Sequence, residues 1–168
     1  MDGSVADDVV LGVDPGLNYT GYGVLRVSGT RWTILEAGVV RSQVKATLAS
    51  RLIEIHRGIT EVLQAFQPSV LALENLYSHY KHPRTAILMG HARGVICLAA
   101  AQCQVEIANY AATQIKKTLT GSGRAPKAQV QHAICREFCL KEVPEPPDVA
   151  DALAIALCHV HLRKTNVG

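Results

Sequence analysis

The segment VVLGVDPGLNYTGYGV, residues 9–24, decides how this chain of 168 residues folds. Its first half is a run of β-branched and aliphatic residues that ends at Asp14, which is the pattern of a buried strand. Pro15 and Gly16 then turn the chain, and a second apolar stretch begins at Thr20. A carboxylate at the end of a buried strand is costly unless a partner compensates its charge, so Asp14 is the first candidate site residue.

Acidic residues recur at two later places. Glu74 ends the apolar run VLALE, which also reads as a strand, and Asp148 and Asp151 lie in PPDVADALAIAL. The last two are three residues apart and share one face of a predicted helix. Divalent metal ions are natural partners for carboxylates clustered at strand ends, so these acids predict a Mg²⁺-binding pocket if the fold brings them together.

Each acid also has a purely structural alternative. Asp14 before Pro-Gly suits the start of a turn, whereas Asp148 suits a helix N-cap and Asp151 suits the positive end of the helix dipole. Glu74 fits a structural role least well, because no residue near it in the sequence pairs with it.

The chain reads as three strands, a helix, a strand, a helix, a strand and then helices. Short turns join the first three strands, which predicts an antiparallel meander, and a parallel crossover is expected to lead to the fourth. A chain of this length suits a single domain, residues 1–168, with residues 1–7 as a flexible tail. The expected strands span residues 8–14, 20–27, 32–40, 70–74 and 105–108, and the expected helices span residues 46–66, 85–101, 111–119, 128–140 and 148–162.

Composition narrows the class of protein. With 48% hydrophobic residues and no apolar run near the roughly 18 residues of a membrane span, a globular cytoplasmic protein is expected. The acidic N-terminus lacks the apolar core of a secretory signal. The five cysteines show no CxxC spacing and are expected to be reduced thiols.

The net charge of +3 conceals a basic middle. Residues 79–127 contain seven Lys or Arg against a single acid, Glu106. A basic surface beside an acidic pocket predicts that a polyanion is held next to metal ions. The alternative is an ordinary solvated face, which also gathers charges.

Five motifs, in order, resemble the RuvC-type Holliday junction resolvases. They are GVDPGLNYTGYGV, ALENLY, GHARG, TQIKKTLTGSGRAPKAQVQ and DVADALAIALCH, and the match runs from residue 11 to residue 161. The resemblance implies an α/β ribonuclease H-like fold, with a mixed five-stranded sheet flanked by helices. It also implies an endodeoxyribonuclease that resolves four-way DNA junctions by symmetric paired nicks.

The resemblance assigns roles to the acids. Asp14, Glu74, Asp148 and Asp151 match the family's metal-binding residues, which hold two Mg²⁺ per active site, and Mn²⁺ is expected to substitute. Two such ions, roughly 3.5–4 Å apart, serve the attacking and the leaving oxygen of an in-line displacement.

The resemblance also assigns basic and aromatic residues. Lysines at the positions of Lys116 and Lys127 lie near the scissile phosphate in that family, which suggests transition-state stabilisation and groups Lys127 with the catalytic residues. Tyr77 stands where the family carries an aromatic that stacks on a base. The DNA-binding candidates are Tyr77, Lys81, Arg84, Lys116, Lys117, Arg124 and Lys127.

Further implications concern partners. The family acts as homodimers, with the small-residue helix around Gly90 and Gly94 at the two-fold axis, and it cooperates with the RuvA–RuvB branch-migration complex. His159 and His161, near the end of the last helix, are expected to be cations favoured by the helix C-terminus, with a metal role as the alternative.

Three other functions compete with the resolvase interpretation. An actin-like ATPase domain has a similar first phosphate loop, but it needs a second domain for which 168 residues leave no room. A binding module without catalysis is disfavoured by the presence of all the acids and lysines. The main alternative is another ribonuclease H-like nuclease that acts on RNA–DNA hybrids or flaps, because its acid chemistry is the same.

Overall fold

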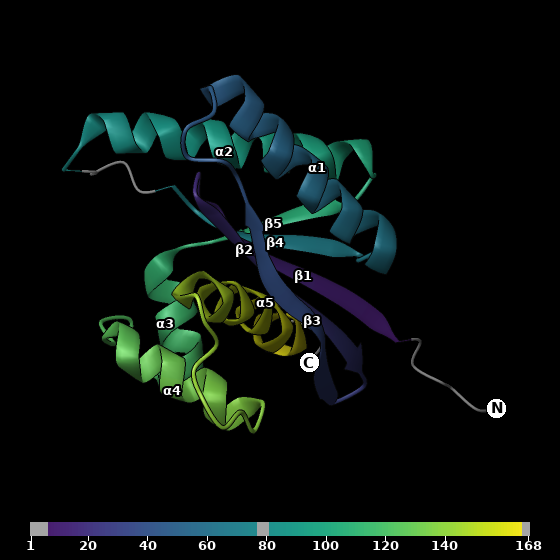
Figure 1. Ribbon diagram of the computed structural model, residues 1–168. Coiled ribbons are helices and arrows are strands. Elements are labelled where there is room, and N and C mark those ends of the chain that lie inside the picture. Colours follow the sequence, from purple (N-terminus) through teal and green to yellow (C-terminus); the bar gives the residue numbers. More distant parts are fainter. Residues whose placement is uncertain (1–6, 77–80, 166–168) are drawn as a thin grey trace.

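A computed structural model of the chain describes residues 7–76 and 81–165. Within these ranges five strands form one mixed sheet in the order β3-β2-β1-β4-β5 (Figure 1). The expected α/β class with a mixed five-stranded sheet is thereby confirmed. The strands are β1 (Asp8–Asp14), β2 (Tyr19–Ser28), β3 (Arg31–Arg41), β4 (Val70–Glu74) and β5 (Glu106–Tyr110).

The strand pairing matches the predicted topology. β1, β2 and β3 pair antiparallel as a meander, and β4 pairs parallel with β1 on the other side. β5 then pairs parallel with β4 and forms the second edge of the sheet. Because β1 and β4 run the same way, their carboxyl ends, Asp14 and Glu74, meet at one end of the sheet.

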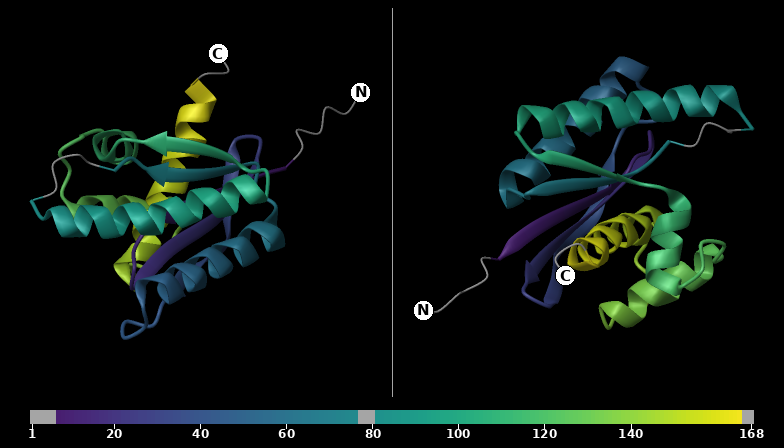
Figure 2. Two further views of the ribbon diagram at one scale, coloured as in Figure 1. Left: turned by 90° about the horizontal axis from the view of Figure 1, so that it is seen from above. Right: turned by 180° about the vertical axis from the view of Figure 1, so that it is seen from behind.

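Helices cover both faces of the sheet in the described part of the chain (Figure 1 and Figure 2). α1 and α2 lie side by side on one face, and the three later helices lie on the other. The helices are α1 (Leu48–Phe66), α2 (Pro83–Gln102), α3 (Ala112–Thr120), α4 (Lys127–Glu137) and α5 (Pro147–Thr165).

Side chains of β1 alternate between two hydrophobic cores. Leu11 and Val13 pack into the core under α1 and α2, whereas Val10 packs into the core around α5. The period of two in a strand therefore directs Gly12 and Asp14 toward α5 as well. This alternation decides that the carboxylate of Asp14 opens on the α5 face.

Glycines let α5 approach the sheet closely. An added Cβ at Gly12 would lie 2.3 Å from the carbonyl oxygen of Ala152, and one at Gly21 would lie 2.1 Å from that of Asp148. Since these distances are far below van der Waals contact, α5 rests on backbone rather than on side chains. The first turns of α5 are therefore held directly above the end of β1.

Local chemistry sets the helix ends. The side chain of Thr47 accepts a hydrogen bond from the backbone N–H of Ser50, so α1 begins at Leu48 rather than at residue 46. The helix expected over residues 128–140 ends at Glu137, because Cys139 adopts a left-handed φ of 53°.

Three further expectations concern the chain as a whole. All five cysteines lie in the described ranges and are unpaired. None of the described helices is long and apolar enough to cross a membrane. Of the expected tail, residues 1–6 lie outside the description, while Asp7 accepts a hydrogen bond from the hydroxyl of Ser28.

Candidate active site

Three acidic side chains meet in one open pocket at the carboxyl ends of β1 and β4. Asp14 and Glu74 come from the adjacent strands, and Asp151 comes from the second turn of α5. The pocket has a volume of about 240 Å³, and Lys116 and Lys127 also line it. The fold therefore gathers acids that are 60 or more residues apart in sequence beside two cations.

Asp14 is the most perturbed of these carboxyls. Burial, together with the charges of neighbouring carboxylates, raises the pKa of Asp14 to about 8. The contributing neighbours, in order of their effect, are Asp151, Asp148 and Glu74. Without a bound cation the site is therefore electrostatically strained, and a positive charge would relieve that strain.

The other two pocket acids show the same effect more weakly. Burial raises the pKa of Glu74, the charge of Asp151 adds to this rise, and Lys116 opposes it. Burial also raises the pKa of Asp151, while a hydrogen bond from Lys127 acts in the opposite direction. Each acid of the pocket thus has a lysine that partly balances it.

Lys127 is the first residue of α4 and bridges to α5. Its ammonium nitrogen lies 3.1 Å from a carboxylate oxygen of Asp151. This hydrogen bond raises the pKa of Lys127, so the side chain stays protonated at neutral pH. Because its side chain is 58% exposed, Lys127 reaches the pocket from the solvent side and remains accessible to an anionic ligand.

Asp148 borders this pocket without lining it. α5 begins at Pro147, so Asp148 lies in the first helical turn, where the helix dipole favours a negative charge. Its backbone is packed against Gly21 of β2, and its charge acts on Asp14. Asp148 therefore stands on the β2 side of the acids, and its charge also acts on Lys127.

The donor set suits a hard divalent cation. Carboxylate oxygens are the ligands that Mg²⁺ prefers, and the lysines compensate their mutual repulsion here only in part. Among the described residues, no three His, Cys, Asp or Glu side chains already converge into a metal-binding group. The residues present fit such an ion by chemistry and charge. Lys127 donates a hydrogen bond to one of the carboxylates, that of Asp151.

The remaining DNA-binding candidates lie around this end of the molecule. Lys117 and Arg124 are exposed, on α3 and on the turn that precedes α4. Lys81 and Arg84 are exposed at the start of α2. Tyr77 lies outside the described residues.

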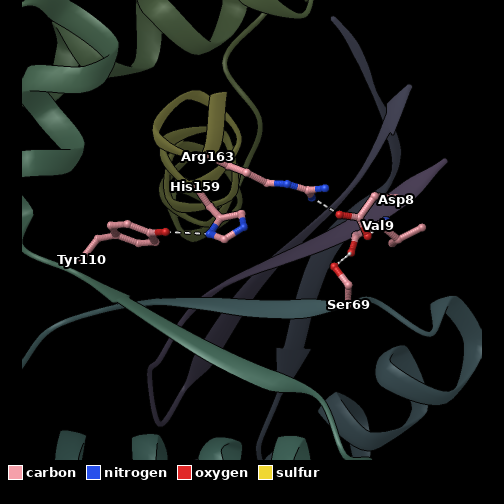
Figure 3. Close-up of polar contacts among 6 residues, drawn as sticks. All are labelled: Asp8, Val9, Ser69, Tyr110, His159 and Arg163. Atoms are coloured by element: carbon pink, nitrogen blue, oxygen red, sulfur yellow. Dashed lines mark hydrogen bonds and ion pairs between the residues drawn. The ribbon is translucent and has the colours of Figure 1, made fainter. Parts of the chain in front are cut away.

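A hydrogen bond next to the pocket was not foreseen from the sequence. Tyr110, the partner of Glu74 in the β4–β5 pairing, shares a 2.6 Å hydrogen bond with Nδ1 of His159 (Figure 3). His159 follows Asp151 at a spacing of eight residues, which returns to nearly the same face of a helix. That spacing was the available signal, but the sequence could not identify the partner.

Both histidines near the end of α5 were predicted to be cations, and this prediction is wrong for His159. Burial lowers the pKa of His159, and the charge of Arg163 adds to this effect, so the ring is neutral rather than cationic at neutral pH. His161 stacks edge-on against Trp32, with ring centroids 5.1 Å apart. Neither ring contacts the acidic pocket.

Comparison with known proteins supports the family resemblance along nearly the whole chain. The family described as "Crossover junction endodeoxyribonuclease RuvC" matches residues 10–159. A protein of that name from Rhodopirellula baltica is 55% identical over 158 residues, which cover 94% of this chain and 89% of the relative. One from Desulforamulus reducens is 38% identical, with 95% and 98% covered.

Solved structures give the same result for the fold. A Thermus thermophilus RuvC in complex with a Holliday junction substrate has a TM-score of 0.88 at 34% identity, and 95% of this chain and 96% of that chain are covered. The yeast mitochondrial Holliday junction resolvase has a TM-score of 0.65 at 13% identity, with 92% and 80% covered, and supports the fold alone.

Proposed function

Because this chain belongs to the RuvC family of crossover junction endodeoxyribonucleases, we propose that it resolves four-way DNA junctions by metal-dependent hydrolysis of one phosphodiester in each of two strands. One observation carries the proposal: Asp14, Glu74 and Asp151 share a single pocket with Lys116 and Lys127. Acids alone would repel DNA, and lysines alone would only bind it. Together they suit a phosphodiester held against a divalent cation.

The family implies a divalent metal, and we propose that Asp14, Glu74, Asp148 and Asp151 hold two Mg²⁺ ions, with Mn²⁺ as a substitute. When bound, the ions supply positive charge to the attacking and leaving oxygens of the displacement. The raised pKa of Asp14 supports this proposal, because a cation is the simplest remedy for four carboxylates in mutual repulsion.

The lysines then act on the substrate itself. We propose that the protonated Lys127 contacts the scissile phosphate and stabilises the negative charge that builds up on its oxygens. Lys116 lines the same pocket and binds the phosphate from the α3 side. A water oxygen bonds to phosphorus and the bond to the 3′-oxygen breaks, which leaves a 5′-phosphate and a 3′-hydroxyl.

The remaining DNA-binding assignments extend outward from this pocket. Exposed cations on α3, on the turn before α4 and at the start of α2 provide backbone contacts at both margins of the site. Tyr77, which follows Glu74 by three residues, is proposed to stack on a base at the junction centre. The residues proposed for these contacts are Lys81, Arg84, Lys117 and Arg124.

A homodimer accounts for nicks in two strands. α2 exposes Ile87 and Leu98, which are 63% and 50% exposed. Between them, an added Cβ at Gly90 or Gly94 would meet no atom within 4 Å, so this side of α2 is open to close approach by another chain. A two-fold axis through this face would give one active site for each of two symmetric strands.

One assignment rests on the family alone: cooperation with the RuvA–RuvB complex follows from the family's role. We also treat the chain as one nuclease domain, because the pocket residues come from strands of a single sheet and from the helices α3, α4 and α5.

The decisive experiment incubates the protein with a mobile four-way DNA junction and maps the products on every strand. Symmetric paired nicks that require Mg²⁺ or Mn²⁺ and disappear in EDTA are expected. Asp14→Asn should bind the junction without cutting it, and Asp7→Asn, one residue before the distant end of the same strand, should cut normally. Nicks confined to RNA–DNA hybrids or flaps would instead establish the alternative nuclease, and binding without nicks in either metal would establish a non-catalytic module.

A further inference from the structure

An arginine and a tyrosine form an exposed pair on the other side of the acids from the lysines. Tyr19 begins β2 and Arg41 ends β3, and the two residues are partners in the antiparallel pairing. The guanidinium carbon of Arg41 lies over the ring of Tyr19, 5.5 Å from its centroid. Tyr19 is 42% exposed and Arg41 is also exposed, so the pair is accessible to a ligand.

The strand alternation places this pair on the same face as the acids. Gly21 is the partner of Asp14 in one direction and of Val39 in the other, and Val39 packs into the core around α5. Tyr19 lies two residues before Gly21 and Arg41 lies two residues after Val39, so both face α5 as well. They lie just beyond Gly21, against which the first turn of α5 is packed.

The pair and the lysines therefore flank the acids from opposite sides. β3 and β5 are the two edges of the sheet, and β5 leads into α3, which carries Lys116 (Figure 1). Arg41 is on β3, two strands away from Asp14 on β1. At roughly 4.8 Å per strand this separation across the sheet is about 10 Å. A phosphate within about three nucleotides of the acids can span it, since each strand carries one phosphate per roughly 3.4 Å of helix axis.

A rigid frame supports this side of the site. Arg51 of α1 donates to the hydroxyl oxygen of Ser42 at 3.0 Å and to the amide oxygen of Asn18 at 2.5 Å. The hydroxyl of Ser42 donates in turn to the carbonyl of Leu17. These bonds tie the segment that follows Asp14 to the segment that follows Arg41, so the pair is held in register with the acids.

Arg41 forms none of the ion pairs found among the described residues. Glu145 lines the same pocket as Arg41 without an ion pair to it, and Glu54 accepts a hydrogen bond from the backbone N–H of Gln43 at 2.8 Å. Lys45, four residues after Arg41, is also exposed. A guanidinium without an ion-pair partner, beside an aromatic face, is suited to a phosphate and its attached sugar or base.

We propose that Tyr19 and Arg41 bind the DNA strand at a second phosphate, on the opposite side of the acidic pocket from Lys116 and Lys127. This inference rests on the proposed function. The guanidinium of Arg41 binds the phosphate, and the ring of Tyr19 orients the guanidinium and packs against the nucleotide. A strand anchored on both sides of the acids is held with its intervening phosphate at the carboxylates, which fixes where it is cut.

The first test measures the affinity for a fluorescent four-way junction in EDTA over a series of salt concentrations. Arg41→Gln should weaken binding about tenfold at low salt and reduce the slope of log K against log[salt] by about one, the loss of one phosphate contact. Arg41→Lys should restore the slope, because it keeps the charge. Arg31→Gln, which removes an exposed arginine from the distant end of the same strand, should behave as the wild type.

A second test locates the phosphate. Neutral methylphosphonate is placed at single positions on either side of the cleavage point of one junction strand. At one position within about three nucleotides of the cleavage point, the methylphosphonate should weaken binding of the junction by the wild type. At the same position it should not weaken binding by Arg41→Gln any further. Tyr19→Phe should bind as the wild type, and Tyr19→Ala should bind more weakly.

The outcomes separate this inference from the proposed function. If Arg41→Gln binds and cuts junctions with the wild-type salt dependence, the second phosphate site is wrong while the resolvase function stands. In that case the pair serves a protein partner or only the fold. If the wild type itself does not bind junctions, the proposed function fails first. Matching thermal unfolding midpoints for Arg41→Gln and Arg31→Gln establish that folding is not the cause.

Discussion

Tyr110 and His159 join the last residue of β5 to α5 through a hydrogen bond of 2.6 Å between the phenol oxygen and Nδ1 (Figure 3). Tyr110 is paired with Glu74, and His159 lies about two helical turns beyond Asp151. The bond therefore links the strand beside one pocket acid to the helix that carries another. Farther along α5, Arg163 bonds to Asp8 at the opposite end of β1, so the helix is fixed to the sheet at two points.

Tyr110→Phe removes the hydroxyl and keeps the ring. We expect a loss of about 1–2 kcal/mol in the free energy of unfolding, because Nδ1 of the half-buried His159 is left without its partner. Cleavage should fall several-fold as α5 loosens over the pocket. Thermal unfolding and junction cleavage rates check the two effects. Tyr22→Phe, which deletes a hydroxyl bonded to Glu36 on the other face of the sheet, should leave cleavage unchanged.

Asp14→Asn should stabilise the metal-free protein at alkaline pH. A folded-state pKa raised from 3.8 to about 8 favours the neutral carboxyl, so the wild type loses stability as the pH rises from about 4 to 8. Asparagine is neutral throughout. At pH 8 in EDTA we expect a gain of about 3 kcal/mol, since one pKa unit corresponds to about 1.4 kcal/mol and solvent access to the pocket reduces the full amount.

The opposite end of β1 supplies the control for this experiment. Burial alone would raise the pKa of Asp8, but hydrogen bonds from Ser69 and Arg163 outweigh it and lower the pKa. The charged form thus stabilises the fold above pH 3.8, and this contribution is lost below it. Asp8→Asn should therefore cost about 0.5–1 kcal/mol of folding stability at neutral pH.

Added Mg²⁺ should stabilise the wild type and should not stabilise Asp14→Asn. Equal stabilisation of both proteins would contradict the assignment of Asp14 as a metal ligand.

Gly12→Ala tests the close approach of α5. The new Cβ would lie 2.3 Å from the carbonyl oxygen of Ala152 and 2.6 Å from the backbone nitrogen of Ala156, so the helix must move. We expect a loss of at least about 3 kcal/mol in stability and a larger loss of cleavage, because Asp148 and Asp151 move with α5. Gly94→Ala makes the same change where no atom lies within 4 Å, and it should not destabilise the monomer. Near-normal cleavage by Gly12→Ala would show that the acids tolerate this displacement.

Sequence patterns predicted the helices and strands, and they also predicted that Asp14 and Glu74 meet. Both predictions have a physical basis. Apolar runs of period two and helical spacing identify the elements, and parallel neighbours end on the same side of a sheet. The approach of Asp151 to these acids is also found. The metal and DNA roles of these residues remain predictions.

Two side-chain contacts between distant elements were beyond prediction. Tyr110 and His159 are separated by 49 positions, and neither carries a local signal for the other. The pairing of Tyr19 with Arg41 depends on an irregularity in register between Val24 and Leu25, so counting back from the turn misses it. The prediction that His159 is cationic was wrong because burial, which only the fold reveals, outweighs the effect of the helix dipole.

Leu98→Glu tests the proposed dimer. A carboxylate in the exposed apolar face of α2 should be tolerated by the monomer, since Leu98 is 50% exposed, and should be costly at a two-fold interface, where it meets its own copy. Sedimentation should show a dimer for the wild type and a monomer for the variant. The variant should then cut one strand of a junction at a time rather than both together. Ile53→Glu makes an equivalent change at a 57% exposed position of α1 and should remain dimeric. A wild type that sediments as a monomer on junction DNA and still makes paired nicks would contradict this role for α2.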